Sequence, residues 1–360
     1  MSSTIVMSTH PTPIYVLGDS HALEFNMRLY ETDDDRQFLF LSAYAPGLTA
    51  AACAGSDGEL SRALAGALTR SGLLVKAGGR EQAFHRTDDP HWSHVALVQG
   101  RPRTQPAVAI SIGGLDIVHF GVGLAETDDI ALPPELVEPS GPLSGDPAPG
   151  ALPFGEAVRL FGERLQPLEQ GLRELRADGF ERLALLSLAP PTPHDGAFRA
   201  VRADLGLTET PSHASLAWRT KCALVANAAL SAVAARSGVT FVDRWPDQVR
   251  GGVALPGLLT DWMHLTGWAA DATATALIDV FERGTPHAPQ APPAYFQVYL
   301  QDLRSGSGVS EYTVGQADFD ALRAASPETL VALHDVNERT TIWVNTARVM
   351  GAVELPLTRA

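Results

Sequence analysis

The sequence predicts a doubly wound α/β domain with about five parallel strands, followed by a small α+β appendage. Two observations indicate this fold class. Short continuous apolar runs alternate with segments of helical periodicity over the first 284 residues, and buried parallel strands separated by helices produce such a pattern. Of the 360 residues, 45% are hydrophobic and 19% are charged. This composition is sufficient for a sizeable core and excludes global disorder.

The predicted strands are short apolar runs that end at turn-forming residues. The first run ends at Gly18, and the third ends at Gly113. In chain order, the five predicted strands span residues 14–17, 38–41, 108–112, 183–188 and 239–242.

The segments between the strands carry apolar residues at helical intervals, of which Leu60, Leu64 and Leu68 are one set. One segment is different, because residues 124–154 are acidic and rich in Pro and Gly, which predicts a long surface loop. The predicted helices span residues 58–71, 155–178, 214–236 and 265–283.

The composition changes near Gly284, where a Pro-rich stretch begins. We therefore predict a first domain over residues 1–284, a linker over 285–293 and a small module over 294–360. We prefer dimerisation or packing over ligand binding as the role of this module. The association we consider is therefore a homo-oligomer formed through the module. Its predicted elements are a strand at 295–300, a helix at 317–325, and a hairpin of 330–333 with 341–344.

Charge and composition exclude several classes of protein. The 27 basic and 41 acidic residues give a net charge of −14, which opposes binding to nucleic acid or to an anionic membrane surface. No apolar run is long enough to span a membrane. The first 27 residues contain no Lys or Arg and no continuous apolar segment, so no signal peptide is predicted. With only Cys53 and Cys222, no disulfide framework is possible. We expect a cytoplasmic protein.

A serine follows the first predicted strand directly, in the segment Gly18-Asp19-Ser20-His21. At such a strand-to-helix turn, the hydroxyl of Ser20 is exposed at the carboxyl edge of the sheet. The backbone N–H groups at the helix start stabilise a developing anion. An acyl-transfer nucleophile requires this setting, although an ordinary N-cap serine is the structural alternative.

Asp261 and His264 lie three residues apart, after the last predicted strand. This spacing allows the carboxylate to reach the imidazole Nδ1 and leaves Nε2 to face a nucleophile. A helix-start aspartate beside a structural histidine is the alternative. The first and last strands end at the same edge of a doubly wound sheet. The pattern therefore favours a Ser20–His264–Asp261 triad.

Residues 17–21 and 261–265 resemble the nucleophile and acid–base blocks of the SGNH (GDSL-type) hydrolase family. Weaker similarity is found at 46–50, 113–116 and 187–191, so the resemblance covers about residues 13–283 in order. It implies a three-layer, flavodoxin-like α/β/α fold. It also implies cofactor-independent hydrolysis or transfer of a small acyl group from a small-molecule or carbohydrate ester.

In this resemblance, Ser20 is the nucleophile, His264 is the general base and then acid, and Asp261 orients His264. The oxyanion hole is expected from the N–H groups of Ser20 and Gly47. His21, Gly113 and Asp116 are candidates for the substrate pocket, although a structural role that accepts backbone N–H bonds is preferred for Asp116.

One departure from the family pattern concerns the oxyanion hole. The asparagine that usually contributes to it would fall at Leu115, whose side chain donates no hydrogen bond. Loss of one such donor typically lowers the rate on the order of 10²–10³-fold. A catalytically weak or inactive binding protein on the same fold is therefore the second hypothesis.

Two competing constellations remain. His91 and His94, with His85 nearby, have the residue types of a metal site, but solvated histidines are the preferred interpretation, and no metal is predicted. Residues 18–22 are one position away from the G-x-S-x-G elbow of α/β-hydrolases. A nucleophile on the first strand and an Asp–His pair three residues apart argue against that fold.

Overall fold

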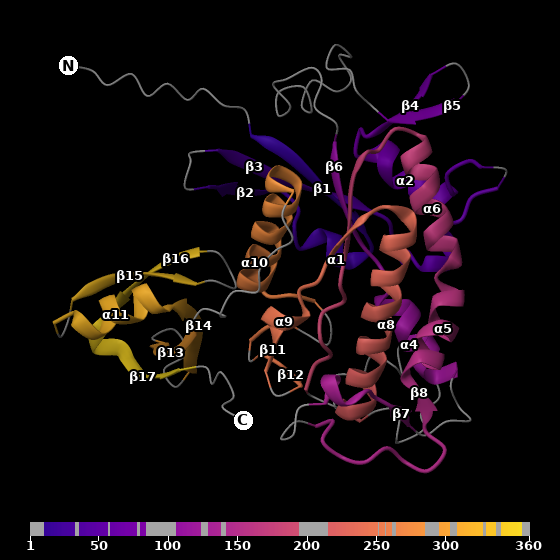
Figure 1. Cartoon of the computed structure of the whole chain (residues 1–360). Helices are drawn as coiled ribbons and strands as arrows, with labels where there is room; N and C mark the ends of the chain where they lie inside the picture. The colour runs from indigo at the N-terminus through magenta and orange to yellow at the C-terminus, as the bar shows by residue number, and fades with distance from the viewer. Residues whose placement is uncertain are drawn as a thin grey trace.

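A six-stranded sheet forms the centre of the molecule (Figure 1). Its strands run in the order β10 (Thr240–Val242), β9 (Arg182–Leu186), β6 (Ala107–Ser111), β1 (Thr12–Gly18), β3 (Gln37–Tyr44) and β2 (Arg28–Glu31). The computed structural model describes residues 11–32, 36–56, 58–77, 80–83, 106–123, 129–137, 142–193, 215–250, 252–255, 257–260, 264–284, 295–302, 308–326, 329–335 and 340–354.

Five of these strands are parallel, as the apolar runs predict, and β2 pairs antiparallel with β3 at one edge. Numbered along the chain, the parallel strands have the order 2-1-3-4-5, which is the flavodoxin-like arrangement. The strand order reverses between β1 and β6. In open α/β sheets, ligands bind outside the carboxyl ends of the strands at this point.

Both faces of the sheet are covered, and β1 contributes alternate side chains to the two cores. Tyr15 and Leu17 belong to one buried cluster, and Ile14 and Val16 belong to the other. On the first face lie α2 (Arg62–Arg70), α4 (Gly114–Gly123), α5 (Phe154–Arg164), α6 (Gln166–Ala177) and α8 (Leu216–Ser237). On the second face lie α1 (Ser20–Leu23) and α10 (Gly267–Ile278) (Figure 1).

The single helix predicted over 155–178 is wrong, because two helices, α5 and α6, meet at Leu165. Pro167 explains the break. A proline inside a helix lacks the N–H that bonds to the carbonyl four residues earlier, and its ring clashes with that carbonyl. Pro167 is tolerated in the first turn of α6, where no such bond is required.

The loop predicted over 124–154 is also only partly a loop. Within its described part, β7 (Ile130–Ala131) pairs in parallel with β8 (Leu152–Pro153), and a 3₁₀ turn spans Pro134–Leu136. Further short elements of the first 284 residues are a 3₁₀ turn at Ala50–Cys53, the hairpin of β4 (Leu74–Ala77) and β5 (Arg80–Ala83), α9 (Trp245–Gln248), and the pair β11 (Val249–Arg250) with β12 (Val253–Ala254).

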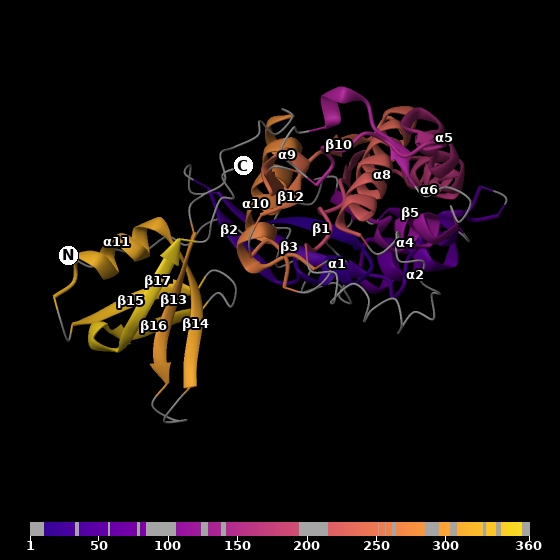
Figure 2. The same ribbon diagram turned by 90° about the horizontal axis from the view of Figure 1, so that it is seen from below.

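The predicted strand, helix and hairpin near the C-terminus are confirmed. Three antiparallel strands have the order β14 (Gly308–Gly315), β13 (Tyr295–Asp302) and β17 (Val349–Glu354), and β15 (Leu330–Asp335) pairs with β16 (Thr340–Asn345). Helix α11 (Gln316–Ala324) lies against β15 (Figure 2). These elements have a buried cluster of their own, which includes Phe296, Val314 and Leu333. The predicted linker lies outside the described residues.

No helix in the described part of the chain is both long and apolar enough to cross a lipid bilayer.

Candidate active site

Ser20 is the first residue of α1, at the point where β1 ends. The residue that caps this helix is Asp19, whose carboxylate accepts the N–H of His21 at 3.1 Å. Because Asp19 serves as the N-cap, the hydroxyl of Ser20 is not required for capping. The N-cap alternative for Ser20 is therefore wrong.

Gly18 allows β1 to approach β6 closely beside Ser20. A Cβ atom added at Gly18 would lie 2.3 Å from the backbone oxygen of Ser111 on the neighbouring strand. The carbonyl of Gly18 also accepts the N–H of Ala45, at the end of β3, at 2.8 Å. The carboxyl ends of three adjacent strands are thus held together immediately before Ser20.

His264 reaches Ser20 from the other end of the domain. Its Nε2 atom lies 2.8 Å from the Ser20 Oγ atom, across 244 residues of sequence. The loop that carries it is closed by backbone hydrogen bonds, from Thr260 N–H to the His264 oxygen at 2.8 Å and from Thr266 N–H to the Leu258 oxygen at 2.9 Å. A hydroxyl that donates to an imidazole nitrogen at this distance is the geometry of a nucleophile with its general base.

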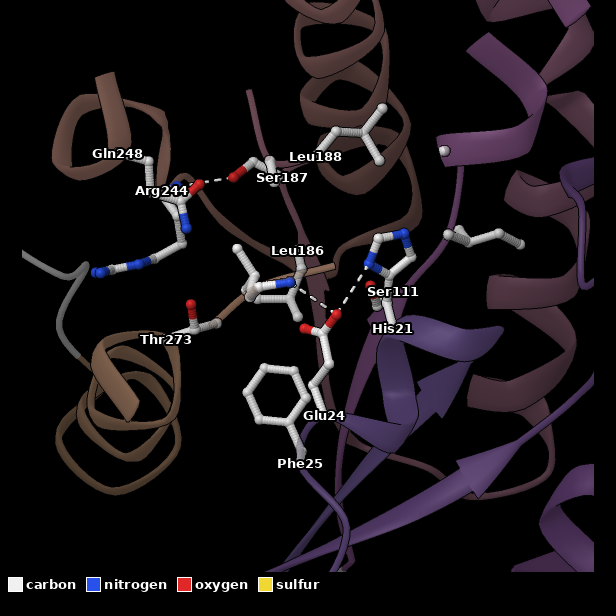
Figure 3. A pocket seen from close by; sticks show the side chains of 14 residues that line it. His21, Glu24, Phe25, Ser111, Leu186, Ser187, Leu188, Arg244, Gln248 and Thr273 are labelled. Atoms are coloured by element: carbon white, nitrogen blue, oxygen red, sulfur yellow. Dashed lines mark hydrogen bonds and ion pairs between the residues drawn. The ribbon is translucent and has the colours of Figure 1, made fainter. Parts of the chain in front are cut away.

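The predicted third member of the triad, Asp261, lies outside the described residues, so its role stays a prediction. The carboxylate that the structure does bring to this site is that of Glu24. Its Oε1 atom accepts the N–H of Leu265 at 2.9 Å and lies 3.6 Å from Nδ1 of His21 (Figure 3).

The sequence reading missed Glu24. It follows Ser20 by four positions and His21 by three, and these are the spacings at which helical side chains lie side by side. That spacing was the available signal.

Gly47 lies in the turn that follows β3. The N–H of Leu48 bonds to the oxygen of Ala45 at 3.2 Å, with Pro46 and Gly47 at the centre of the turn. Gly47 has φ +62°, a conformation that glycine adopts without strain. Its N–H and that of Ser20 belong to the carboxyl ends of adjacent strands, β3 and β1. Their convergence on an oxyanion stays a prediction.

Asp116 has a structural contact, as the sequence interpretation prefers. Both of its carboxylate oxygens lie 3.0 Å from the N–H of Ala50, so it ties the first turn of α4 to the 3₁₀ turn that begins at Ala50. Burial raises the pKa of this carboxyl, and the hydrogen bond from Ala50 opposes the shift. Gly113, with φ +111°, is buried just before α4.

A cavity of about 40 Å³ lies beside His21, at the ends of β6 and β9 (Figure 3). It has room for only a few water-sized groups. Of the three predicted pocket residues, His21 lines it, and Gly114 contributes to the wall in place of Gly113. The lining is mixed: apolar side chains such as Leu186 and Leu265 lie beside the polar residues Glu24, Ser111, Ser187, Arg244, Gln248 and Thr273.

Arg244 and Gln248 are almost fully buried in this lining, with 4% and 3% of their surfaces exposed. Arg244 Nη1 lies 2.7 Å from Asp247 Oδ2, and the Arg244 backbone N–H donates to Ser187 Oγ at 2.8 Å. Burial lowers the pKa of Arg244, and the nearby Asp247 carboxylate opposes this. An ion pair therefore fixes this part of the wall.

Two further residues outside this cavity have structural settings. Asn227 of α8 accepts the N–H of Leu188 at 2.7 Å, which is a structural contact to the loop after β9. Cys53 is buried, and burial raises the pKa of its thiol to about 12. The histidine cluster at residues 85–94 lies outside the described residues.

No protein-family model matches the sequence, and no curated protein matches it either. Among solved structures, the chain is similar to a lipase/acylhydrolase from Enterococcus faecalis, with 12% identity and a TM-score of 0.31 over 77% of this chain and 99% of that one. It is also similar to phospholipase A1 from Streptomyces albidoflavus NA297, with 11% identity and a TM-score of 0.34 over 75% and 99%.

A third similar structure is an extracellular lipase from Streptomyces rimosus, with 16% identity and a TM-score of 0.21 over 73% of this chain and 99% of that one. Identities and TM-scores this low carry no argument about activity or substrate. The assignment to a flavodoxin-like α/β fold rests on the chain's own strand order and helix layers.

Proposed function

We propose that the chain is a serine ester hydrolase of the SGNH kind, which cleaves a small-molecule or carbohydrate ester through an acyl-Ser20 intermediate. The observation that carries the proposal is the 2.8 Å contact between Ser20 Oγ and His264 Nε2. It joins a nucleophile and a base at the strand-order reversal between β1 and β6, where α/β sheets bind their ligands.

In the first half-reaction, His264 Nε2 takes the proton of the Ser20 hydroxyl while Oγ attacks the ester carbonyl. The carbonyl electrons move to oxygen, and the N–H groups of Ser20 and Gly47 are the proposed donors to this oxyanion. The tetrahedral intermediate then collapses. The alcohol leaves with the proton from His264, and the acyl group stays on Ser20.

In the second half-reaction, His264 takes a proton from water, which attacks the acyl-serine carbonyl. Free acid leaves, and the proton returns to Ser20. Asp261 is the proposed partner that orients His264. If a hydroxyl of a second substrate replaces water, the same steps transfer the acyl group instead.

The cavity beside His21 supports the proposal that the substrate has a small acyl or alcohol group. Its volume of about 40 Å³ is small for a fatty acyl chain, and buried Arg244 and Gln248 would be left against apolar atoms if such a chain entered. An acetyl-sized group is compatible with both its volume and its lining.

The second candidate function is a weak or inactive binding protein on the same fold, and Leu115 favours it. In the first turn of α4, where the family resemblance expects an oxyanion asparagine, this side chain offers no donor. An activated Ser20 distinguishes the two functions, because a pure binding protein does not require one.

The test is hydrolysis of p-nitrophenyl acetate by the wild type, Ser20→Ala and His264→Ala, together with fluorophosphonate labelling of Ser20. We expect wild-type turnover and labelling, and a loss of about 10³-fold or more in both variants. Equal background rates in all three proteins with no labelling of the wild type would reject the enzyme and favour the binding protein.

A further inference from the structure

We propose that His21, Glu24 and His264 form an inhibitory site for a divalent transition-metal ion, with Zn²⁺ as the best match. The proposal rests on the proposed function, because the ion would occupy the imidazole that activates Ser20. One ligand atom from each of the three side chains lies within 4.8 Å of the others. The two imidazole rings are 5.0 Å apart between centroids.

The donor geometry fits a small tetrahedral ion. Zn²⁺ binds imidazole nitrogen and carboxylate oxygen at about 2.0–2.2 Å, so neighbouring donors in a tetrahedral site are about 3.3–3.5 Å apart. His21 Nδ1 and Glu24 Oε1 are already 3.6 Å apart (Figure 3). The donor of His264 lies within 4.8 Å of the other two, so it has to move closer by at most about 1.5 Å on the same geometry.

Glu24 supplies an independent indication of a missing partner. Its Oε1 atom accepts the N–H of Leu265, whereas its Oε2 atom is buried without a hydrogen-bond partner among the residues that the structure describes. Only 9% of the Glu24 side chain is exposed. A buried carboxylate oxygen without a partner is unfavourable, and a cation that the Glu24 carboxylate binds through both of its oxygens would satisfy it.

The chemistry of the imidazole makes metal binding and catalysis mutually exclusive. A neutral imidazole has a single nitrogen that accepts, and in His264 the nitrogen beside Ser20 Oγ has this role in the proposed mechanism. A metal ion takes that lone pair directly, or it binds the other nitrogen and leaves Nε2 protonated. Either way His264 loses the capacity to take the Ser20 proton.

The first test measures Zn²⁺ binding to full-length protein freed of metal by a chelator, using isothermal titration. We expect one ion per wild-type chain. His21→Ala and Glu24→Gln should each lose on the order of tenfold or more in affinity, since even outer-shell changes have effects of this size. Glu24→Gln retains an oxygen that can accept the Leu265 N–H. A loss of Zn²⁺ affinity in this variant therefore reports the missing negative charge and not a disturbed fold.

The matched control is His334→Ala. His334 Nδ1 lies 3.2 Å from Asp318 Oδ2 and is also a histidine–carboxylate pair, but it belongs to the C-terminal elements. Its replacement should leave Zn²⁺ affinity unchanged. Equal affinity in the wild type, His21→Ala and Glu24→Gln would overturn the proposal, as would a loss caused by His334→Ala alone.

The second test follows fluorophosphonate labelling of wild-type Ser20 with and without Zn²⁺. We expect the ion to suppress labelling and a chelator to restore it. Unchanged labelling at saturating Zn²⁺ would overturn the inhibitory role. If the metal-free wild type is never labelled, the proposed function fails, whereas the titration of the variants still decides whether the metal site exists.

Discussion

The Glu24 carboxylate, on the helix that begins at Ser20, accepts the backbone N–H of Leu265, the residue next to His264, at 2.9 Å. Ser20 and Glu24 belong to the start and end of the same short helix, whereas His264 and Leu265 belong to a loop 241 or more residues away. This hydrogen bond therefore fixes the loop that carries His264 directly to the helix that begins at Ser20.

Glu24→Ala should weaken catalysis because it releases this loop. A hydrogen bond to a charged group contributes about 1.5–3 kcal/mol, so kcat/KM should fall by roughly 10–100-fold. Glu24→Gln retains an acceptor and should lose less. The kinetics of p-nitrophenyl acetate hydrolysis measure both, and wild-type kinetics in Glu24→Ala would contradict the positioning role.

Gly18→Ala should destabilise the sheet beside Ser20. The new methyl group would lie 2.3 Å from the Ser111 oxygen, and backbone atoms cannot move aside as a flexible side chain does. Overpacking of this kind typically destabilises by about 1–3 kcal/mol. Chemical denaturation measures the loss, and labelling of Ser20 should fall with it.

The control for this prediction is Gly145→Ala. Gly145 is exposed, and a Cβ atom there meets nothing within 4 Å. Its replacement should leave both stability and labelling near the wild-type values. If the Gly18→Ala protein were as stable as Gly145→Ala, strands β1 and β6 would be able to move apart without a loss in the free energy of unfolding, and the prediction would be wrong.

The strands of the central sheet could be predicted because each parallel strand is buried on both faces and reads as an apolar run. Strand β2 escaped prediction for the opposite reason. It lies at the edge, its residues alternate between half-buried and exposed, and its sequence contains no apolar run. Helix α4 was not predicted because its sequence, which includes Ile117, Val118 and Phe120, is apolar on most sides and shows no single apolar face.

The residues of the candidate site also differ in how well the sequence predicts them. Ser20 and His264 could be predicted to meet, because each follows a strand and all parallel strands share one carboxyl edge. The spacing of Glu24 from Ser20 and His21 places it beside them, but a glutamate on a short helix normally faces solvent, so the spacing alone does not indicate its contact. Its importance arises only from Leu265, which the fold brings to it across 241 residues.

Cys53 and Cys222 should be inert toward alkylation in the folded protein. Burial raises the pKa of each thiol to about 12. Almost no thiolate is therefore present at a pH of about 8.5, which is the ordinary pKa of a cysteine thiol. Mass spectrometry after iodoacetamide treatment at this pH should find neither thiol modified, and both modified in denaturant. Rapid modification of either thiol in the native protein would contradict its buried position.

Asp116 should make stability depend on pH in a defined direction. Burial raises the pKa of its carboxyl in the folded state above the ordinary value of 3.8, so the folded protein holds this proton more tightly than the unfolded chain. The stabilisation is complete below 3.8 and is lost as the pH rises through the raised value.

Asp116→Asn removes this titration and leaves an oxygen that can accept the Ala50 N–H. The free energy of unfolding of the wild type minus that of Asp116→Asn should therefore decrease as the pH is raised from about 3.8 toward neutrality. Urea denaturation of both proteins over this range measures the difference. A difference that stays constant would mean that the carboxyl titrates alike in the folded and unfolded states, whereas one that increases would mean that its ionised form stabilises the fold.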